Sequence, residues 1–269
     1  MTQIGKFLNF SEVLNTEQIA AVRARNAEIV VRCPDHGEFS RGDLLKHDMQ
    51  EDACPECHRA KVEAYMREQR LKTAVHFFRT ASGVPVRFQE SSFDGYQPGS
   101  EQARKILATM REYAGKFDQH RKLGLSLILC GGPGTGKTHL SCAVLRSLAF
   151  DQGITGKYAT AYRVVQEVRE CYRNRELSEL QAMDAFIQPD LLVLDEIGVQ
   201  YGTDSEHLIL FNILNGRYEA LKPTIVISNL NVDGVKKYLD DRVYDRLREN
   251  GGGVLAFDWE SWRQKRLGK

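Results

Sequence analysis

The chain has 269 residues, of which 42% are hydrophobic and 27% charged, a balance typical of globular domains that excludes wholesale disorder. It carries 37 Lys or Arg and 36 Asp or Glu, a net charge of +1, so no bulk positive charge indicates nucleic-acid binding. The sequence contains no run of about 18 apolar residues, and its first residues lack the pattern of a secretion signal. We therefore expect a cytoplasmic protein without a membrane partner.

The first third of the chain differs in character from the rest. A helical stretch at residues 15–27 precedes a loop-rich segment with clustered Cys and His. A helix-like connector follows, and it is locally basic because residues 59–87 contain seven Lys or Arg and two Glu. Any regular element is then interrupted by Gly83, Pro85, Gly95 and Pro98. We predict an N-terminal domain at 1–90 and a second domain at 91–269.

Two chelating pairs lie in the N-terminal domain, Cys33-Pro-Asp-His36 and Cys54-Pro-Glu-Cys57. This C-x-x-H and C-x-x-C spacing is typical of one tetrahedral Zn²⁺, and four ligands leave no open position for catalysis. Clustered cysteines in a reducing compartment favour metal over disulfides. Iron–sulfur ligation and a redox pair at Cys54 and Cys57 are alternatives. Two other histidines are possible substitutes for His36 as the ligand: His47 and His58.

The second domain alternates short apolar runs with longer amphipathic runs, which indicates an α/β fold with a parallel sheet flanked by helices. The expected strands cover residues 125–130, 157–160, 191–194, 224–227 and 254–257. The expected helices cover residues 139–150, 162–172, 205–221 and 240–249.

A glycine-rich loop joins the first of these strands to a helix. Residues 131–138, GGPGTGKT, fit the phosphate-loop pattern G-x-x-x-x-G-K-[ST]. Glycines let backbone N–H groups surround phosphate oxygens, and the helix N-terminus adds positive potential. We expect Lys137 to contact the β- and γ-phosphates and Thr138 to ligate Mg²⁺. The expected nucleotide-binding residues are Gly132, Pro133, Gly134, Thr135, Gly136, Lys137, Thr138 and His139.

Two adjacent carboxylates, Asp195 and Glu196, follow the strand at 191–194. At the carboxyl end of a buried parallel strand, Asp195 would hold Mg²⁺ and Glu196 would act as the base for an attacking water. The guanine-specific N-K-x-D pattern is absent from the sequence, so we expect ATP rather than GTP. Asn229 follows the next strand and could orient the water, although a turn or cap role is the alternative.

An arginine-rich segment, DRVYDRLR at 241–248, places Arg242 and Arg246 at i, i+4 on one helix face. One interpretation is a charged surface helix paired with its own acidic residues. The other is an arginine finger offered to the γ-phosphate of a neighbouring subunit, which would make ATP hydrolysis depend on assembly.

Together with ISN at 227–229, FDGY at 93–96 and WESWR at 259–263, these motifs resemble the DnaC-type helicase loaders of the AAA+ class, over residues 91–269. The related IstB transposition helpers share much of the pattern. The resemblance implies a P-loop NTPase fold and an ATPase that self-associates, binds single-stranded DNA and loads a hexameric replicative helicase. A zinc-containing DNA-binding adaptor is an alternative of another class.

The resemblance also implies residue roles. Lys137, Thr138, Asp195 and Glu196 would be the ATP and Mg²⁺ residues. Asn229 resembles the sensor of the γ-phosphate and Arg246 the finger, with Arg242 and Arg263 as weaker candidates for the trans and sensor roles. The 40 residues after Asn229 are too few for a separate lid domain, as in these loaders.

In such loaders a helical insertion before the strand that ends in Asp195 contacts single-stranded DNA. The corresponding residues here are Tyr172, Arg173 and Arg175, which could stack on a base and bind phosphates. An amphipathic helix with solvated arginines is the alternative. The N-terminal domain of these loaders grips the helicase, usually without an obvious zinc site, so the two cysteine pairs depart from the pattern.

Overall fold

The computed structural model describes residues 20, 30–40, 54–174, 179–198 and 204–262. Internal contacts divide the chain into two compact units, Met1–Glu68 and Gln69–Lys269. Most of the helical stretch expected at 15–27 lies outside the described residues. Within the described ranges, no helix is long and apolar enough to cross a membrane.

The first unit contains a small antiparallel hairpin of β1 (Val30–Cys33) and β2 (Gly37–Ser40). Gly37 closes the turn with a φ of +79°, a conformation that glycine adopts without strain. Helix α3 (Pro55–Thr80) begins in this unit and continues into the second one, where its last turns bury Ala74 and Phe78. Residues 59–80 of the expected basic connector therefore belong to this helix of 26 residues.

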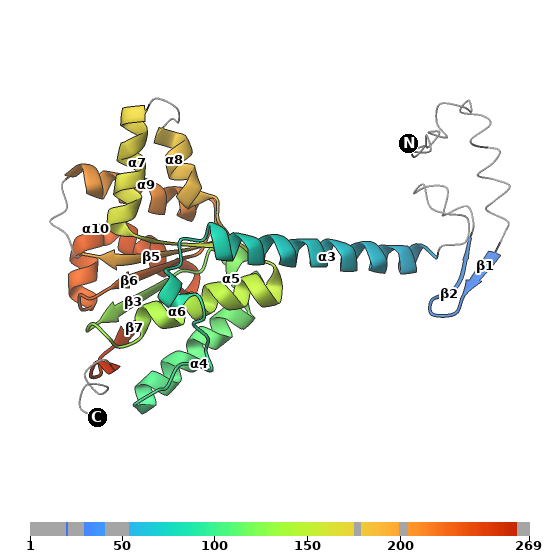
Figure 1. Ribbon diagram of the computed structural model, residues 1–269, viewed down its shortest axis with the longest axis horizontal. Coiled ribbons are helices and arrows are strands. Elements are labelled where there is room, and N and C mark those ends of the chain that lie inside the picture. The colour runs from blue at the N-terminus through green and yellow to red at the C-terminus, as the bar shows by residue number, and fades with distance from the viewer. Residues whose placement is uncertain (1–19, 21–29, 41–53, 175–178, 199–203, 263–269) are drawn as a thin grey trace. The chain divides into compact units, whose positions relative to one another are not determined.

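A five-stranded sheet forms the centre of the second unit (Figure 1). The strands pair in the order β4-β5-β6-β3-β7, and every pair is parallel. Because all strands run in one direction, their carboxyl ends meet at one edge, where α/β proteins bind ligands. The strands are β3 (Leu127–Gly131), β4 (Gly156–Thr160), β5 (Leu191–Ile197), β6 (Thr224–Ser228) and β7 (Gly253–Phe257).

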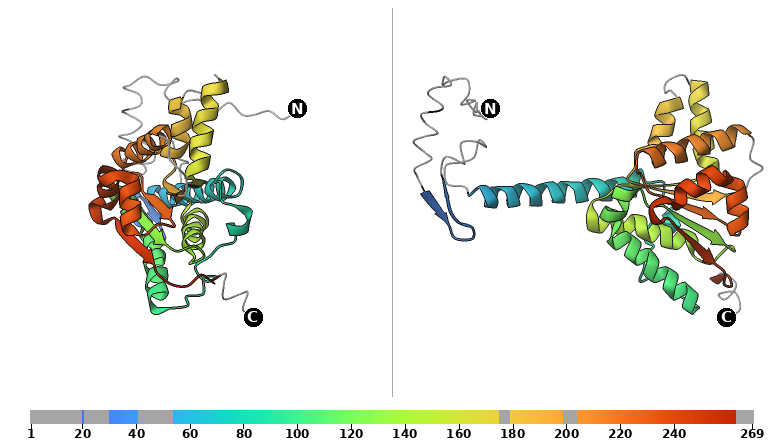
Figure 2. Two further views of the ribbon diagram at one scale, coloured as in Figure 1. Left: turned by 90° about the vertical axis from the view of Figure 1, so that its left-hand side faces the viewer. Right: turned by 180° about the vertical axis from the view of Figure 1, so that it is seen from behind.

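Helices cover both faces of this sheet, as Figure 1 and the view from behind in Figure 2 show. Alternate side chains of β3 face opposite ways: Leu127 and Leu129 pack with α4 and α6, whereas Ile128 packs with α7 to α10. The helices are α4 (Glu101–Gly115), α5 (Phe117–Leu123), α6 (Lys137–Ser147) with a π-helical turn at Leu148–Gln152, α7 (Ala161–Asn174), α8 (Glu179–Ile187), α9 (Asp204–Glu219) and α10 (Val232–Arg248).

The expected α/β fold with a parallel sheet is confirmed, and all five expected strands are present. Helix α10 is longer than expected because it contains a kink at Asp240, whose φ is +63° and whose carboxylate accepts a hydrogen bond from the Val243 N–H. The expected helix at 240–249 corresponds to the part after the kink. Among the described residues after Asn229 there is no lid domain, only α10, a 3-10 turn (Glu249–Gly251) and β7.

The chain leaves α3 along the outer edge of β4. The Ser82 carbonyl accepts a hydrogen bond from the Tyr158 N–H at 2.7 Å, and the Ser82 hydroxyl donates to the Phe78 carbonyl at 2.6 Å. Gly83 follows with a φ of +76°, and a Cβ at this position would lie 2.3 Å from the Tyr158 carbonyl oxygen. The last turn of α3 is therefore fastened to the backbone of Tyr158, and only glycine fits beside it.

Candidate nucleotide site

The phosphate loop lies between β3 and α6 in a cleft of about 1450 Å³ at the carboxyl edge of the sheet, which is ample for a nucleoside triphosphate. Its backbone has a conformation that excludes side chains at two positions. Gly131 has a φ of +123°, and its Cβ would lie 2.5 Å from the Phe257 carbonyl oxygen. Gly136 has a φ of +101°, and its Cβ would lie 2.4 Å from the Tyr96 ring. The geometry of the loop thus requires glycine at these two positions of the motif.

Lys137 lies beneath this loop and is 4% exposed. Its ammonium donates hydrogen bonds to the carbonyl oxygens of Gly131 and Gly132, at 2.6 and 2.7 Å. Burial lowers the pKa of Lys137 to about 8, and the nearby Asp195 carboxylate opposes part of that shift. The side chain is therefore held at the loop by two short hydrogen bonds, and it lines the cleft.

Aromatic residues from two distant segments hold the loop from outside. The Tyr96 hydroxyl and the Trp259 indole N–H both donate to the Thr135 carbonyl, at 3.1 and 3.2 Å. The Trp262 backbone N–H donates to the Gly134 carbonyl at 2.9 Å. Both tryptophans of the chain line the cleft, so their fluorescence should respond to a bound nucleotide.

The adjacent carboxylates of β5 both reach the cleft because the strand is irregular there. Regular alternation would send Asp195 and Glu196 to opposite faces of the sheet. A register shift between Leu194 and Ile197 and a φ of +62° at Glu196 change this arrangement. Asp195 stays buried at 6% exposure, whereas Glu196 is exposed, and both line the cleft. Strained backbone of this kind is common at functional sites.

Asp195 is held by three hydrogen bonds. Its Oδ2 accepts from the Thr138 hydroxyl and from the Tyr158 hydroxyl, each at 2.8 Å, and its Oδ1 accepts from the Glu196 N–H at 2.7 Å. Burial raises the pKa of Tyr158, so its hydroxyl keeps its proton and is the donor. The hydroxyl of Thr138 beside a carboxylate at an open cleft is an oxygen donor set that fits Mg²⁺.

Asn229, the expected sensor, lies at the carboxyl end of β6 and lines the same cleft with an exposed side chain. His139, expected at the nucleotide, also lines the cleft, where its Nε2 lies 2.9 Å from the Ser92 carbonyl oxygen. The phosphate loop, the two carboxylates and Asn229 therefore meet in one place, as the sequence predicts.

The arginines of α10 lie outside the residues that line this cleft. The Arg246 guanidinium donates to the Asn215 side-chain carbonyl and lies over the Tyr218 ring, 5.1 Å from its centroid. Arg242, one turn earlier, is exposed. An arginine finger that acts on a neighbouring subunit does not need to line the cleft of its own chain. The position of Arg246 is therefore compatible both with an arginine finger and with a charged surface helix.

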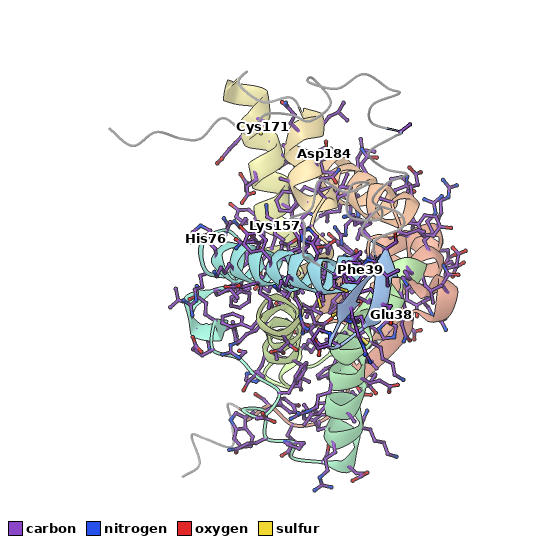
Figure 3. The ribbon with its side chains drawn as sticks, turned by 90° about the vertical axis from the view of Figure 1, so that its right-hand side faces the viewer. Glu38, Phe39, His76, Lys157, Cys171 and Asp184 are labelled. Carbon is purple, nitrogen blue, oxygen red and sulfur yellow. The ribbon has the colours of Figure 1, made fainter. Side chains whose placement is uncertain are left out.

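The expected DNA-contacting residues lie where α7 ends. Tyr172 and Arg173 belong to α7, but their side chains, all of Arg175 and all of Arg263 lie outside the described residues. Helices α7 and α8 pack side by side, and α7 also contacts β4 and β5; Cys171 lies on α7 and Asp184 on α8 (Figures 1 and 3). The expected insertion between β4 and β5 is therefore a helical pair.

In the first unit, the four predicted metal ligands converge. Cys33 and His36 lie at the hairpin turn, whereas Cys54 and Cys57 lie at the start of α3, and the four ligand atoms all lie within 4.8 Å of one another. The Cys33 and Cys57 sulfurs are 3.6 Å apart, and His36 Nδ1 is 3.3 Å from the Cys57 sulfur. Ligands at Zn–S and Zn–N distances on a tetrahedron are roughly 3.5–3.8 Å apart, so the cluster fits one zinc ion.

Asp35 and Glu56 lie beside this cluster and interact with two of its members, Cys33 and His36. A backbone hydrogen bond from Asp35 and the contact with His36 lower the pKa of Cys33 to about 7, which favours the thiolate that binds metal. The Glu56 carboxylate lies 3.7 Å from His36 Nε2, on the side of the ring opposite the cluster. His58 lies outside the group of converging ligands, and His47 lies outside the described residues.

Comparison with known proteins assigns this chain to a family. The family model described as "IstB-like ATP binding protein" matches residues 36–266. The chain belongs to this family. Its members are P-loop ATPases, so this IstB-like chain is an ATPase.

Relatives and solved structures agree with this assignment. The replicative helicase loader DnaC of Escherichia coli K12 is 33% identical over 188 residues, 70% of this chain and 75% of DnaC. The uncharacterized protein YdaV of the same organism is 33% identical over 182 residues, 68% of this chain and 71% of YdaV. A crystal structure of the DnaC helicase loader superposes with a TM-score of 0.58 at 23% identity, covering 64% of this chain and 99% of that one.

The DnaA replication initiator of Aquifex aeolicus, solved with the ATP analogue AMPPCP, superposes with a TM-score of 0.53 at 20% identity. That match covers 69% of this chain and 56% of the DnaA chain, and at this identity the likeness concerns the fold alone. The similarity to DnaC together with the family match supports a DnaC-type replication ATPase.

The sequence did not single out Tyr158, although its hydroxyl contacts Asp195 as closely as that of Thr138 does. A tyrosine in an apolar strand has the pattern of a core residue, and nothing in its spacing connects it to a carboxylate 37 positions later. Only the pairing of β4 with β5 brings the two together.

Proposed function

We propose that this protein loads a hexameric replicative helicase onto single-stranded DNA, with ATP binding and hydrolysis as the switch. The observation that carries the proposal is the 33% identity to the helicase loader DnaC over 75% of DnaC's length. The phosphate loop, Asp195, Glu196 and Asn229 around one cleft support it. A net charge of +1 is compatible with weak DNA binding by one copy and stronger binding by an assembly.

Five residues of the cleft have proposed tasks. Thr138 and Asp195 would hold the magnesium ion, which neutralises phosphate charge when ATP is bound. Lys137 contacts the β- and γ-phosphates, and the loop N–H groups surround them. Glu196, exposed at the cleft, takes the proton of the attacking water, and Asn229 orients that water.

Arg246 is proposed to act on the ATP of a neighbouring copy. Release from Asn215 and Tyr218 would free its guanidinium for the γ-phosphate, so that stimulated hydrolysis depends on self-association. The end of α7, with Tyr172, Arg173 and Arg175, is proposed to contact the DNA strand.

The N-terminal cluster is proposed to hold one structural zinc ion through Cys33, His36, Cys54 and Cys57. The domain at 1–90 would then be a zinc-bearing arm that binds the partner protein, and the domain at 91–269 the ATPase. Binding of the metal would stabilise a hairpin whose own hydrophobic core is small.

A second function is favoured by the description of the matching family, which is that of an IstB-like ATP binding protein. Under it, the same ATPase assists a transposase instead of a helicase. A third hypothesis is a zinc-containing adaptor that only binds ATP. The exposed Glu196 at the cleft disfavours it, because a protein that does not hydrolyse ATP needs no general base.

Capture from native lysate, with and without ATP, separates these functions. The helicase proposal predicts that the tagged protein retains a hexameric replicative helicase when ATP is present, and that Lys137→Ala retains much less. A stable complex with a transposase, and none with a helicase, would replace the first function by the second.

A further inference from the structure

The buried oxygen of Asp195 has a second hydroxyl partner besides Thr138. Tyr158 OH donates to the same Oδ2 at 2.8 Å, from β4, the strand beside β5. With the Glu196 N–H on Oδ1, donors from three parts of the chain fix both oxygens of the carboxylate. A carboxylate held by three donors has one orientation, and that orientation decides where its free lone pairs point.

Tyr158 approaches the carboxylate from the protein interior. Its side chain is 7% exposed and belongs to the core cluster between the sheet and α6, whereas the described residues that line the cleft include Thr138 and Asp195 but not Tyr158. The tyrosine is therefore out of reach of a bound nucleotide, and any effect on the ATP site passes through Asp195.

The hydroxyl of Tyr158 is itself fixed in place. The ring packs in a core of close-fitting apolar side chains, and the backbone N–H is bound to the Ser82 carbonyl at the end of α3. Because both ends of the residue are held, the donor cannot follow a moving carboxylate. The fixed hydroxyl of Tyr158 therefore sets the orientation of the Asp195 carboxylate that accepts its hydrogen bond.

We propose that Tyr158 is a positioning residue that orients the Asp195 carboxylate for the magnesium ion of the ATP site. The inference rests on the proposed placement of that ion at Thr138 and Asp195. Loss of the hydroxyl leaves Oδ2 with one donor fewer, so the carboxylate samples orientations that do not suit the ion. Affinity for the nucleotide alone, which the phosphate loop determines, is unaffected.

Tyr158→Phe tests this proposal, with Tyr113→Phe as the matched control. Both changes remove one hydroxyl from a buried tyrosine, but Tyr113 OH donates to the Leu125 carbonyl and not to a carboxylate. The readout is tryptophan fluorescence during titration with AMPPCP, once with Mg²⁺ and once with EDTA. The ratio of the two affinities is the enhancement by magnesium.

The proposal predicts that Tyr158→Phe lowers this enhancement about five- to tenfold, the effect of one hydrogen bond on an equilibrium, and leaves the affinity in EDTA within twofold. Tyr113→Phe leaves both values unchanged. An unchanged enhancement in Tyr158→Phe overturns the proposal. So does an equal loss of affinity in Mg²⁺ and in EDTA, or a failure of Tyr158→Phe alone to fold, since each indicates a purely structural hydroxyl.

Asp195→Asn distinguishes this inference from the placement on which it rests. If Asp195→Asn abolishes the enhancement and Tyr158→Phe does not, only the role of Tyr158 is wrong. If Asp195→Asn itself keeps the full enhancement, the proposed magnesium site is wrong, and the role of Tyr158 is overturned with it.

Discussion

The hydroxyl of Thr138 donates to Oδ2 of Asp195 at 2.8 Å, although the two residues are 57 positions apart in the sequence. One belongs to the first turn of α6 and the other to β5, the second strand away from β3 in the sheet. The contact joins the phosphate loop to the acidic end of β5.

The charge of Lys137 should make nucleotide affinity depend on pH. Burial lowers its pKa in the protein to about 8, whereas bound phosphates favour the charged form, so binding must take up a proton above pH 8. We expect affinity for AMPPCP to be constant below pH 8 and to fall above it, with a limiting slope of about tenfold per pH unit.

Lys137→Arg is the control for this effect, because a guanidinium stays charged over the whole range. Fluorescence titrations between about pH 7 and 9.5 should show the slope in the unaltered protein and a weaker slope in the variant. The same slope in both proteins would assign the pH effect to another group.

Glu196→Gln should keep ATP binding and lose turnover. The amide cannot take a proton from water, and loss of a general base lowers kcat by about 10²- to 10⁴-fold. Glu260→Gln is the matched control, since it removes another carboxylate that lines the cleft. Phosphate release and AMPPCP affinity are the two measurements. Turnover that survives in Glu196→Gln would exclude this residue as the base.

Arg246→Ala should spare ATP affinity and lose stimulated hydrolysis, by a factor on the order of 10³, if Arg246 is a finger acting on a neighbour. The change also removes contacts with Asn215 and Tyr218. Asn215→Ala breaks the contact with Asn215 but leaves the guanidinium, so it should keep stimulated hydrolysis. A similar loss in both variants would make Arg246 a structural residue of α10, and Arg242→Ala should have the smaller effect.

The cysteine cluster should hold one equivalent of zinc in freshly purified protein, measured by metal analysis. Cys54→Ser should lose the metal and the hairpin unit, because metal binding stabilises that unit. Cys171→Ser, outside the cluster, should keep the metal. Nucleotide affinity should be unchanged in both, since the residues of the ATP cleft all belong to Gln69–Lys269. Less than about half an equivalent in the unaltered protein would contradict the four-ligand site.

Gly83→Ala should destabilise the ATPase unit. The backbone has a φ of +76°, and the new Cβ would lie 2.3 Å from the Tyr158 carbonyl, so we expect a loss of about 1–3 kcal/mol in the free energy of unfolding. Gly115→Ala, at the end of α4 with no atom within 4 Å of its Cβ, should be neutral or stabilising by up to about 1 kcal/mol. Equal midpoints of thermal denaturation for Gly83→Ala and the unaltered protein would contradict this prediction, because the backbone at Tyr158 would then accommodate a Cβ without loss of stability.

Local patterns predicted the parts of the site that depend on residues close together in the chain. The loop at 131–138 and the Asp195–Glu196 pair each carry their chemistry in a few consecutive positions. The convergence of Cys33, His36, Cys54 and Cys57 was predictable for a similar reason, because each pair has the spacing of a single turn. Helix α4 was not predicted from the sequence. Ser100, a residue type typical of helix N-caps, could have indicated its start, and its side chain accepts a hydrogen bond from the Ala103 N–H.

Local sequence patterns could not predict features that depend on the order of strands in the sheet. The central position of β3 between β6 and β7 follows from packing over the whole sheet. Arg217 is a second example: its sequence context in α9 suggests a surface residue, yet it is fully buried. Its guanidinium donates to the Thr224 hydroxyl and to carbonyls of Phe186, Ile187, Pro189 and Pro223. Only the assembled fold places these acceptors around one side chain.

The central claim is that this ATPase loads a helicase, and loading onto closed circular single-stranded DNA tests it most directly. The purified protein is mixed with the replicative hexameric helicase of its own organism, the circle and ATP, and helicase that stays with the DNA after gel filtration is measured. We predict helicase on the circle with the unaltered protein and little with Lys137→Ala. The same small amount of helicase on the circle with and without the protein would contradict the claim.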